Sequence, residues 1–406
     1  MKNLNKMKNM KSILKADIQA FAIIILIALT TLSSCKKDDE VVIQGENNPS
    51  SIIDDITEDI TIDGEVLFIG AIHIKNGAIL TVNPGTRMVF DPDALSYLLV
   101  EQGAKIMAEG THTNPIIMTG GLEEPGSWGG LHICGKAPIN SGETGLSEIG
   151  DAVYGGNIPN DNSGSLQYVR VEYSGTNLDA DHQGNGISFY GVGNETLVDY
   201  VQVYQGFDDG IEFFGGTVNI KHIIVNEAED DSFDWVEGWS GKAQFLIAVQ
   251  GEAGDRGFEG DNLKADNAAS PKSMPHMSNI TLIGGGDADN YGIKLRRGTA
   301  GIFKNIIIAG DFDKGSIHIE NSETLRNLVN GSLLIDYAYI NNVVFDVAIS
   351  YSEDESDPVN IDDFRIEDSP HVFLQNLSHG ITESTVYSGG FDMSTEDSFF
   401  NSTDYI

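Results

Sequence analysis

The sequence predicts an all-β fold, a right-handed parallel β-helix, in which short strands wind into stacked coils. Glycine is abundant, with 46 in 406 residues, and short β-rich runs are separated by turns of Gly, Asn and Asp. Runs of the same form recur at a period in the low twenties, with no helical pattern between them. Strands that repeat in this way form solenoids, whose coils bury their apolar faces only by stacking on one another.

The clearest repeat begins with a small residue and continues as a strand of alternating inward and outward side chains. Its five copies start 24, 22, 25 and 35 residues apart, at Gly186, Gly210, Ser232, Gly257 and Gly292. The longest spacing predicts a loop inserted around residues 261–277. A second set of strands lies between and beside the copies, at residues 169–171, 201–203, 223–225, 280–282 and 306–308. By strand alternation we expect Ile211 and Trp235 to point into the core.

The first 34 residues predict a secretory signal peptide. Five lysines precede the apolar run 20–29, and Ser33 and Ser34 precede Cys35, which is the usual order of charged, apolar and small residues in such signals. The apolar run is too short to span a bilayer comfortably. Residues 32–35, Leu-Ser-Ser-Cys, resemble a bacterial lipobox, and this resemblance implies that Cys35 is lipidated. The alternative is an ordinary signal peptide that contains a cysteine.

The residues after Cys35 predict where the protein is exported. Residues 36–40, Lys-Lys-Asp-Asp-Glu, resemble the export signal of Bacteroidota surface lipoproteins. The resemblance implies a protein that is lipid-anchored in the outer membrane and exposed at the cell surface, whereas the alternative is a solvated charge run. We therefore expect a signal peptide at 1–34, a lipidated cysteine with an acidic tether at 35–56, and a β-helix domain at 57–406.

The mature chain is strongly acidic. The whole sequence has a formal net charge of −37, and removal of residues 1–34 leaves 19 basic and 60 acidic residues, a formal net charge of −41. This charge repels nucleic acid and anionic lipid, so we expect no nucleic-acid partner and no membrane contact other than the anchor. It favours cations such as Ca²⁺, which carboxylates bind, although it also serves solubility alone. The other cysteine, Cys134, is expected to be a packing residue in a strand.

Four motifs in the N-terminal half carry a family resemblance. Residues 79–90 contain Leu-Thr-Val-Asn-Pro-Gly-Thr, residues 98–111 contain Gly-Ala-Lys-Ile-Met-Ala-Glu-Gly-Thr, and Pro-Ile-Ile-Met-Thr and Trp-Gly-Gly follow at 115–119 and 128–130. They resemble a family of Bacteroidota surface-lipoprotein β-helices with a pectin-lyase-like fold. The resemblance covers most of residues 57–406. It implies the fold and says little about chemistry, because the glycines serve tight turns.

Carboxylates recur at matching positions of the repeat. Alternation sends the residue after each repeat's first apolar residue outward, which gives a file of Ser188, Glu212, Asp234, Glu259 and Lys294 on coils about 4.8 Å apart. The preceding turns add Asn185 and further aspartates. The candidate metal or ligand residues are Asp208, Asp209, Glu212, Asp230, Asp231, Asp234 and Glu259. Three interpretations remain open: a solvated acidic face, a site for Ca²⁺ or another cation, and a catalytic centre.

The catalytic interpretation depends on one local resemblance. Residues 208–211, Asp-Asp-Gly-Ile, resemble the double-aspartate coil of polygalacturonase-like glycosidases, in which one carboxylate donates a proton and another activates water. Those enzymes also carry a Gly-His-Gly turn and an Arg-Ile-Lys strand, and neither string occurs here. A pectate-lyase-like reaction would need Ca²⁺ and a basic residue, for which Lys294 or Arg296 is the candidate. We assign no catalytic residue.

The leading functional prediction is a non-catalytic binding or interaction module at the cell surface, for a glycan, an extracellular partner or a neighbouring outer-membrane protein. The alternative is a carbohydrate-active hydrolase or lyase that acts on an extracellular polysaccharide. Trp239 is expected on a turn, where an exposed ring beside carboxylates would contact a glycan, and the competing interpretation is a core role. Genomic context or product release from a uronic-acid polymer would separate the two functions.

Overall fold

The computed structural model describes residues 50–177, 183–285, 290–342, 349–354 and 356–359, with short pieces at 374–375, 378–379, 394 and 397–400. All of these residues belong to one compact unit, Asn47–Ile406. The predicted signal peptide and Cys35 lie outside the described residues. No described helix is long and apolar enough to cross a membrane.

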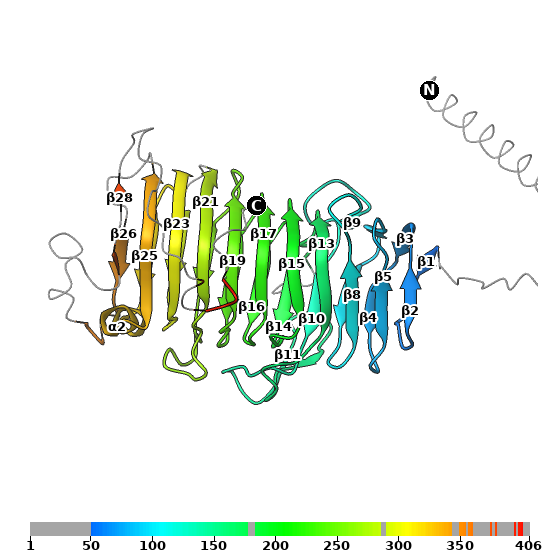
Figure 1. Ribbon diagram of the computed structural model, residues 1–406, viewed down its shortest axis with the longest axis horizontal. Coiled ribbons are helices and arrows are strands. Elements are labelled where there is room, and N and C mark those ends of the chain that lie inside the picture. The colour runs from blue at the N-terminus through cyan, green and yellow to red at the C-terminus, as the bar shows by residue number, and fades with distance from the viewer. Residues whose placement is uncertain are drawn as a thin grey trace, which may run out of the picture. The chain divides into compact units, whose positions relative to one another are not determined.

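The described residues form a right-handed parallel β-helix, as the sequence predicts, whose coils follow one another along the long axis in Figure 1. Two parallel sheets make up the coils. One has 16 strands in the described part of the chain: β1 (Ser51–Ile52), β2 (Ile60–Ile62), β3 (Glu65–Phe68), β5 (Ile79–Val82), β6 (Arg87–Phe90), β8 (Lys105–Glu109), β9 (Ile116–Gly120), β13 (Gly164–Glu172), β15 (Leu197–Tyr204), β17 (Asn219–Asn226), β19 (Lys242–Val249), β21 (His276–Gly285), β23 (Gly301–Asp311), β25 (Leu333–Asn342), β27 (Leu374–Gln375) and β28 (Ser378–His379).

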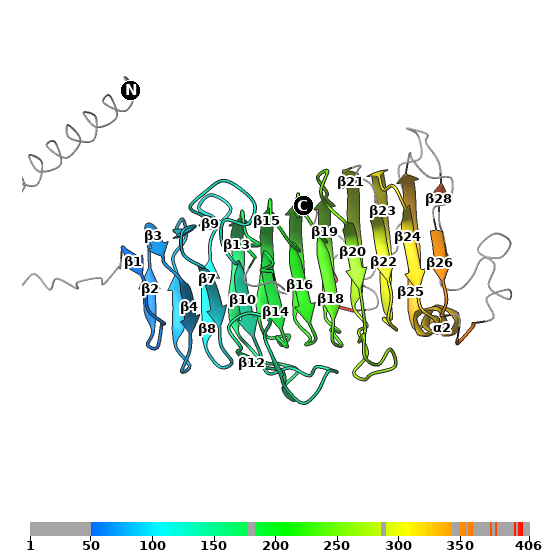
Figure 2. The ribbon, with the colours of Figure 1, turned by 180° about the vertical axis from the view of Figure 1, so that it is seen from behind.

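The other sheet is seen from its own side in Figure 2. It has ten described strands: β4 (Ala71–Ile74), β7 (Tyr97–Val100), β10 (Leu131–Cys134), β14 (Ile187–Tyr190), β16 (Ile211–Phe214), β18 (Phe233–Val236), β20 (Arg256–Gly260), β22 (Tyr291–Leu295), β24 (Gly315–Glu320) and β26 (Ile349–Ser352). The first strand of the fold begins at Ser51, inside the segment assigned to the tether, because Ile52 and Ile56 are buried against the first coil.

The core is one continuous apolar column between the sheets. Ile211 and Trp235 are fully buried in it, as strand alternation predicts. Each repeat starts with a small residue because the next coil lies directly above it: a Cβ atom at Gly210 would lie 2.6 Å from the backbone oxygen of Ser232. Cys134 is fully buried at the end of β10, and burial raises the pKa of its thiol to about 12, which suits a packing residue.

Two insertions project from the same edge of the solenoid, the lower edge in Figure 1. One is the loop at 261–275 between β20 and β21, which the 35-residue spacing predicts. The other, residues 135–163 between β10 and β13, contains a two-stranded antiparallel hairpin, β11 (Gly145–Leu146) and β12 (Val153–Tyr154). They touch through the Asn140 side chain, which donates to Asn262 Oδ1 at 2.8 Å and to the Pro271 carbonyl at 2.9 Å.

A short helix, α2 (Ser322–Asn330), interrupts the coils where the sequence predicts none. Leu325 and Leu328 are buried against the core, and Gly331 ends the helix in the left-handed conformation, with its N–H bonded to the Leu328 carbonyl.

Candidate functional site

The outward file predicted from the repeat exists on the ten-stranded sheet. Strand register places Ser188 beside Glu212, Glu212 beside Asp234, Asp234 beside Glu259 and Glu259 beside Lys294. Parallel pairing keeps every coil in phase, so residues 22–35 apart in sequence become neighbours on one surface. The prediction that these side chains stack is confirmed.

The turn before each strand adds a second row of carboxylates. The Asp231 backbone N–H donates to Asp209 Oδ1 at 2.9 Å, which ties one turn to the next. Carboxylate oxygens come within 4.8 Å of one another in four groups: Asp208–Asp209–Asp230, Asp209–Glu212–Asp234, Asp230–Asp231–Asp255 and Asp231–Asp234–Glu259. We call the seven sequence-predicted members the acidic cluster: Asp208, Asp209, Glu212, Asp230, Asp231, Asp234 and Glu259.

The acidic cluster is not a solvated face, which corrects one of the three sequence-based interpretations. Asp209, Asp231 and Glu259 are only 7%, 4% and 5% exposed. The remaining members are half-buried. Sequence periodicity shows which residues point away from the core, but it does not show what covers them.

The 135–163 insertion packs beside the cluster. Its Ile149 and Tyr154 join Tyr190 and Phe214 in a second apolar group on the outside of the ten-stranded sheet. The Tyr154 hydroxyl donates to Glu237 Oε2 at 2.7 Å. Glu148 from this insertion lies close enough to raise the pKa of Glu212, so an eighth carboxylate, for which the repeat gives no signal, joins the cluster.

Burial and crowding raise the pKa values of the cluster. Burial is the larger cause for Asp208, whose pKa rises to about 7, and the Asp230 charge is the next. Burial also raises the pKa of Asp209, Glu212, Asp231 and Asp234 well above the usual range, and neighbouring carboxylates add to each rise. At neutral pH, carboxylates crowded in this way need bound protons, a bound cation or basic partners to offset their repulsion.

Among the residues that the structure describes, the basic partners lie on one side, in the coils of β20 and β22. Arg256 Nε lies 3.0 Å from Glu259 Oε1, and Arg296 Nε donates to Asp261 Oδ1 at 2.7 Å. Lys294 Nζ lies 3.4 Å from Glu320 Oε2. The face therefore has an acidic half on β16 and β18 and a charge-paired half on β20 and β22. Asp261 also belongs to this charge-paired half. It lies four residues after Gly257, where a repeat begins, so the sequence repeat could have identified it.

Three buried oxygens in the acidic half accept no hydrogen bond from any described residue: Asn185 Oδ1, Asp231 Oδ1 and Asp234 Oδ1. Asn185 is 2% exposed, and its Nδ2 donates to Glu212 Oε2 at 2.6 Å and to Ser188 Oγ at 3.1 Å. Asp231 Oδ1 lies 3.7 Å from Arg256 Nη1, beyond hydrogen-bond distance. Carboxylate and amide oxygens left without donors suit a hard cation such as Ca²⁺.

The predicted exposure of Trp239 is wrong. Trp239 is fully buried, its ring stacks on Phe213 with centroids 3.9 Å apart, and its Nε1 donates to the Val218 carbonyl at 3.1 Å. The ring is part of the core column, and the 261–275 loop contacts the Trp239 backbone, since the Met274 N–H bonds to the Trp239 carbonyl. Trp239 therefore cannot contact a glycan in this conformation.

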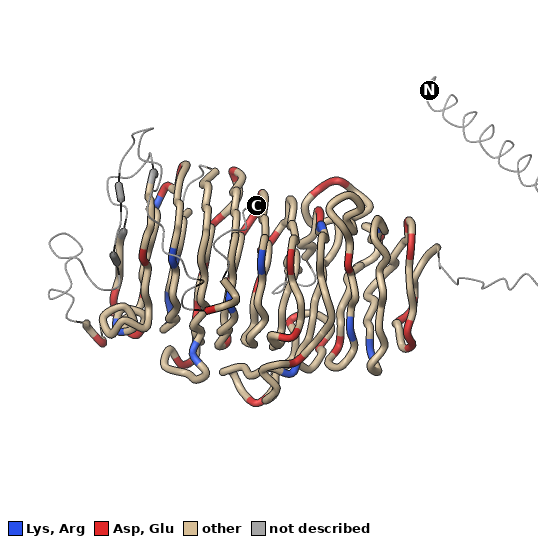
Figure 3. The backbone as a smooth tube through the Cα atoms, viewed as in Figure 1, with Lys and Arg blue, Asp and Glu red and all other residues tan. Residues whose placement is uncertain are grey.

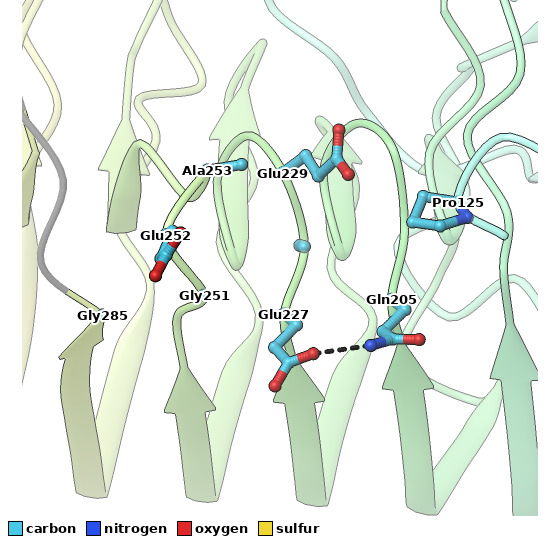
Figure 4. Close-up of a pocket in the computed structure, with 9 residues that line it drawn as sticks. Pro125, Gln205, Glu227, Glu229, Gly251, Glu252, Ala253 and Gly285 are labelled. Atoms are coloured by element: carbon cyan, nitrogen blue, oxygen red, sulfur yellow. Dashed lines mark hydrogen bonds between the residues drawn. The ribbon is translucent and has the colours of Figure 1, made fainter.

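Two hollows lie on the other sheet, away from the acidic cluster. The larger, about 460 Å³, lies among the turns that follow β15, β17 and β19 and beside Gly285 at the end of β21 (Figure 4). Its lining includes Glu227, Glu229 and Glu252, and Gln205 Nε2 donates to Glu227 Oε2 at 2.7 Å. It continues the acidic character of the whole solenoid, on which Asp and Glu are widely spread (Figure 3).

The smaller hollow, about 190 Å³, lies beside a row of residues that we call the elbow row. Each long strand from β13 onward bends at one residue with a positive φ between 49° and 60°. The elbow row is Tyr168, Tyr200, His222, Phe245, Asn279, Asn305 and Tyr337. Its first four rings stack in sequence, with centroids 4.6, 4.3 and 4.9 Å apart. The sequence contained part of this signal, because Tyr168, Tyr200 and His222 directly precede members of the second strand set.

A family model described as "Pectate-lyase like beta helix domain" matches residues 54–369. The chain belongs to this family. The match covers most of the β-helix, including the acidic cluster and both hollows. A pectate-lyase-like domain fits either a binding module or an enzyme that acts on polysaccharide. No curated protein matches the chain.

Proposed function

We propose that this pectate-lyase-like β-helix is a lipid-anchored lipoprotein of the outer membrane, exposed at the cell surface, that binds an extracellular glycan without cleaving it. The proposal that the protein does not cleave the glycan rests on the burial and pairing of its acidic and basic groups. Asp209, Asp231 and Glu259 are buried, and Arg256 and Arg296 are paired with buried carboxylates. A polymer cannot reach these groups without displacing the covering loops.

Cleavage of a polysaccharide requires acidic or basic side chains that are free to act on the substrate. A glycosidase needs one carboxylic acid at the glycosidic oxygen and one carboxylate at the opposite side of the sugar. A lyase needs a base free to take a proton. Lys294 and Arg296 both lie in ion pairs with carboxylates. These pairs argue against elimination, and the burial of Asp209, Asp231 and Glu259 argues against hydrolysis.

The enzymatic alternative, a hydrolase or lyase, is favoured by one observation. Asp208 and Asp230 are half-buried rather than fully buried, and the pKa of Asp208, raised to about 7, would suit a general acid near neutral pH. We keep it as the second candidate.

One experiment separates the two functions. The full chain in detergent is incubated with neutral polysaccharides and with polygalacturonate, and both retention and product release are measured. Retention without new reducing ends or unsaturated sugars is expected. Release of either product, abolished by Asp208→Asn, would replace the binding proposal with the enzymatic one.

We further infer that the acidic half holds Ca²⁺. Asp209, Glu212 and Asp234 would supply carboxylate ligands, and the unpartnered Oδ1 of Asn185 would supply a neutral one. The ion would offset the mutual repulsion of carboxylates that lack basic partners, and it would hold neighbouring coils together. In this proposal Ca²⁺ stabilises the fold and takes no part in a reaction.

A further inference from the structure

We propose that the elbow hollow, the smaller hollow beside the elbow row, binds a neutral sugar ring. This proposal rests on the proposed function and names the place and the ligand class. The hollow is bordered by the rings of Tyr168, Tyr200 and His222 and by the outward side chains Arg170, Gln202 and Ile224 of the same strands. Ligand sites commonly combine an apolar lining with a few polar groups that fix orientation.

The stacked rings form a rigid wall along the solenoid. Tyr168 and Tyr200 are nearly parallel, at 3°, and Tyr200 and His222 lie at 8°. Tyr200 is 38% exposed, whereas His222 is 5% exposed. Tyrosine supplies a large amphipathic contact area at a small cost in conformational entropy, which suits a ligand with both C–H faces and hydroxyls.

Two polar atoms at the hollow have no hydrogen-bond partner among the described residues. His222 Nδ1 lies 2.8 Å from Asp199 Oδ1, and its Nε2 is buried and unpartnered. An N–H at Nδ1 directed at the carboxylate leaves Nε2 as an acceptor. Arg170 Nε is likewise unpartnered, and it is a donor. A hydroxyl both donates and accepts, so a sugar could satisfy either atom after a small rotation of the exposed Tyr200 side chain.

Charge argues for a neutral ligand. The arginine at the hollow, Arg170, has its Nη2 2.7 Å from Glu172 Oε1, so its charge is already paired. The other basic residues among the described lining are the exposed His112 and the buried His222. The chain as a whole carries a formal net charge of −37. A uronic-acid polymer would meet this repulsion without an unpaired Lys or Arg among the described lining to offset it, whereas a neutral hexose would not meet the repulsion.

The opposite side of the elbow row is already covered. The C-terminal piece 397–400 lies against the first halves of β17 and β19, where Lys221 Nζ donates to the Phe399 carbonyl at 2.7 Å and Lys242 pairs with Asp397. The hollow lies on the second halves of β13, β15 and β17, beyond the elbow. The elbow row thus separates a covered surface from an open one.

The test uses affinity electrophoresis of the full chain in detergent through gels containing dextran, mannan or polygalacturonate. We expect retardation by at least one neutral polymer, and about tenfold weaker binding in Tyr200→Asn, the upper end of what one aromatic contact contributes. Asparagine is chosen because Asn279 and Asn305 already occupy elbow positions. Tyr337→Asn, at an elbow outside the hollow, is the matched control and should bind as wild type.

A second variant separates ring stacking from the polar contact. His222→Phe keeps a ring in the stack, as Phe245 does at the next elbow, and removes the Nε2 acceptor. We expect weaker binding, together with a lower melting temperature because the Nδ1 contact with Asp199 is lost as well. If both Tyr168→Asn and Tyr200→Asn are retarded as strongly as wild type, the elbow hollow is not the binding site, although the chain still binds a glycan. Retardation by polygalacturonate alone would overturn the neutral ligand. No retardation by any polymer would overturn both this site and the proposed function.

Discussion

At the scale of single residues, the informative feature is that carboxylates of neighbouring coils are buried against one another. Asp209, Glu212, Asp231 and Asp234 crowd together on neighbouring coils, and among the described residues their basic neighbours lie on the side of β20 and β22. Burial of uncompensated charge is costly. The acidic half therefore should respond to the two small species that relieve it, Ca²⁺ and protons.

Calcium should stabilise the folded chain. Adding millimolar Ca²⁺ to chelator-treated protein is expected to raise the melting temperature by a few degrees, since only the folded state presents the site. The double variant Asp209→Asn with Asp231→Asn should keep the fold but lose most of this rise in melting temperature. Glu252→Gln, in the larger hollow on the other sheet, should keep the full rise. Equal shifts in wild type and the double variant would show that Ca²⁺ acts elsewhere.

Protons should replace calcium. The folded-state pKa of Asp208 is raised to about 7 from 3.8, so the folded state binds the proton more tightly than the unfolded state. The stability from this group is fully present below about pH 4 and is lost as pH rises through about 7. In the presence of chelator, the melting temperature of the wild type minus that of Asp208→Asn should fall as pH rises from about 4 to about 7. Added Ca²⁺ should make this difference less dependent on pH. A difference independent of pH would contradict the raised pKa.

At the scale of elements, the repeat sets the strands and the insertions set access to the face. The 135–163 insertion is held by the Asn140 contacts with Asn262 and Pro271 and by the Tyr154–Glu237 hydrogen bond. These bonds join it to β18 and to the 261–275 loop. Backbone hydrogen bonds such as Ala137 N–H to the Gly191 carbonyl hold its first residues to the coils, so the hairpin beyond them is the part of this surface that can open locally.

Loosening this insertion should expose the acidic cluster before it unfolds the solenoid. Asn140→Ala with Tyr154→Phe removes three hydrogen bonds, each worth about 1 kcal/mol. We expect faster limited proteolysis within 135–163 and faster amide exchange on β16 and β18, with a small change in global melting. Asn160→Ala, which removes an exposed contact with Glu195, is the control. Unchanged proteolysis would show that the apolar contacts of Tyr190 and Phe214 suffice.

At the scale of the whole molecule, the proposed anchor decides where the β-helix works. Cys35 lies outside the described residues, and lipidation there is the one membrane attachment that the sequence offers. Cys35→Ser should move the protein from the membrane fraction to the soluble fraction. Cys134→Ser, at a buried position, should leave the fractionation unchanged. Membrane retention of Cys35→Ser would contradict the anchor.

The β-helix itself was predictable because its determinants are local and periodic. A small residue such as Gly210, followed by alternating apolar residues, sets one coil, and parallel stacking repeats it without a shift in register. The same periodicity placed Glu212, Asp234 and Glu259 side by side. The same repeat also marks part of the elbow row, because rings directly precede Val169, Val201 and Ile223. The bend between the two halves of each strand, however, is visible only in the folded backbone.

The tertiary structure alone decided which outward residues remain exposed. Periodicity determines whether a side chain points away from the core, but the loops that return over that surface come from non-repeating sequence. Residues 135–163 pack on the outside of the sheet beside the acidic face, and Trp239, which local position placed on an open turn, turns into the core and stacks on Phe213. The sequence thus determined the solenoid and its charged file, because both follow from repeats. The folded chain determined burial, raised pKa values and the open hollow, because these depend on contacts between distant segments.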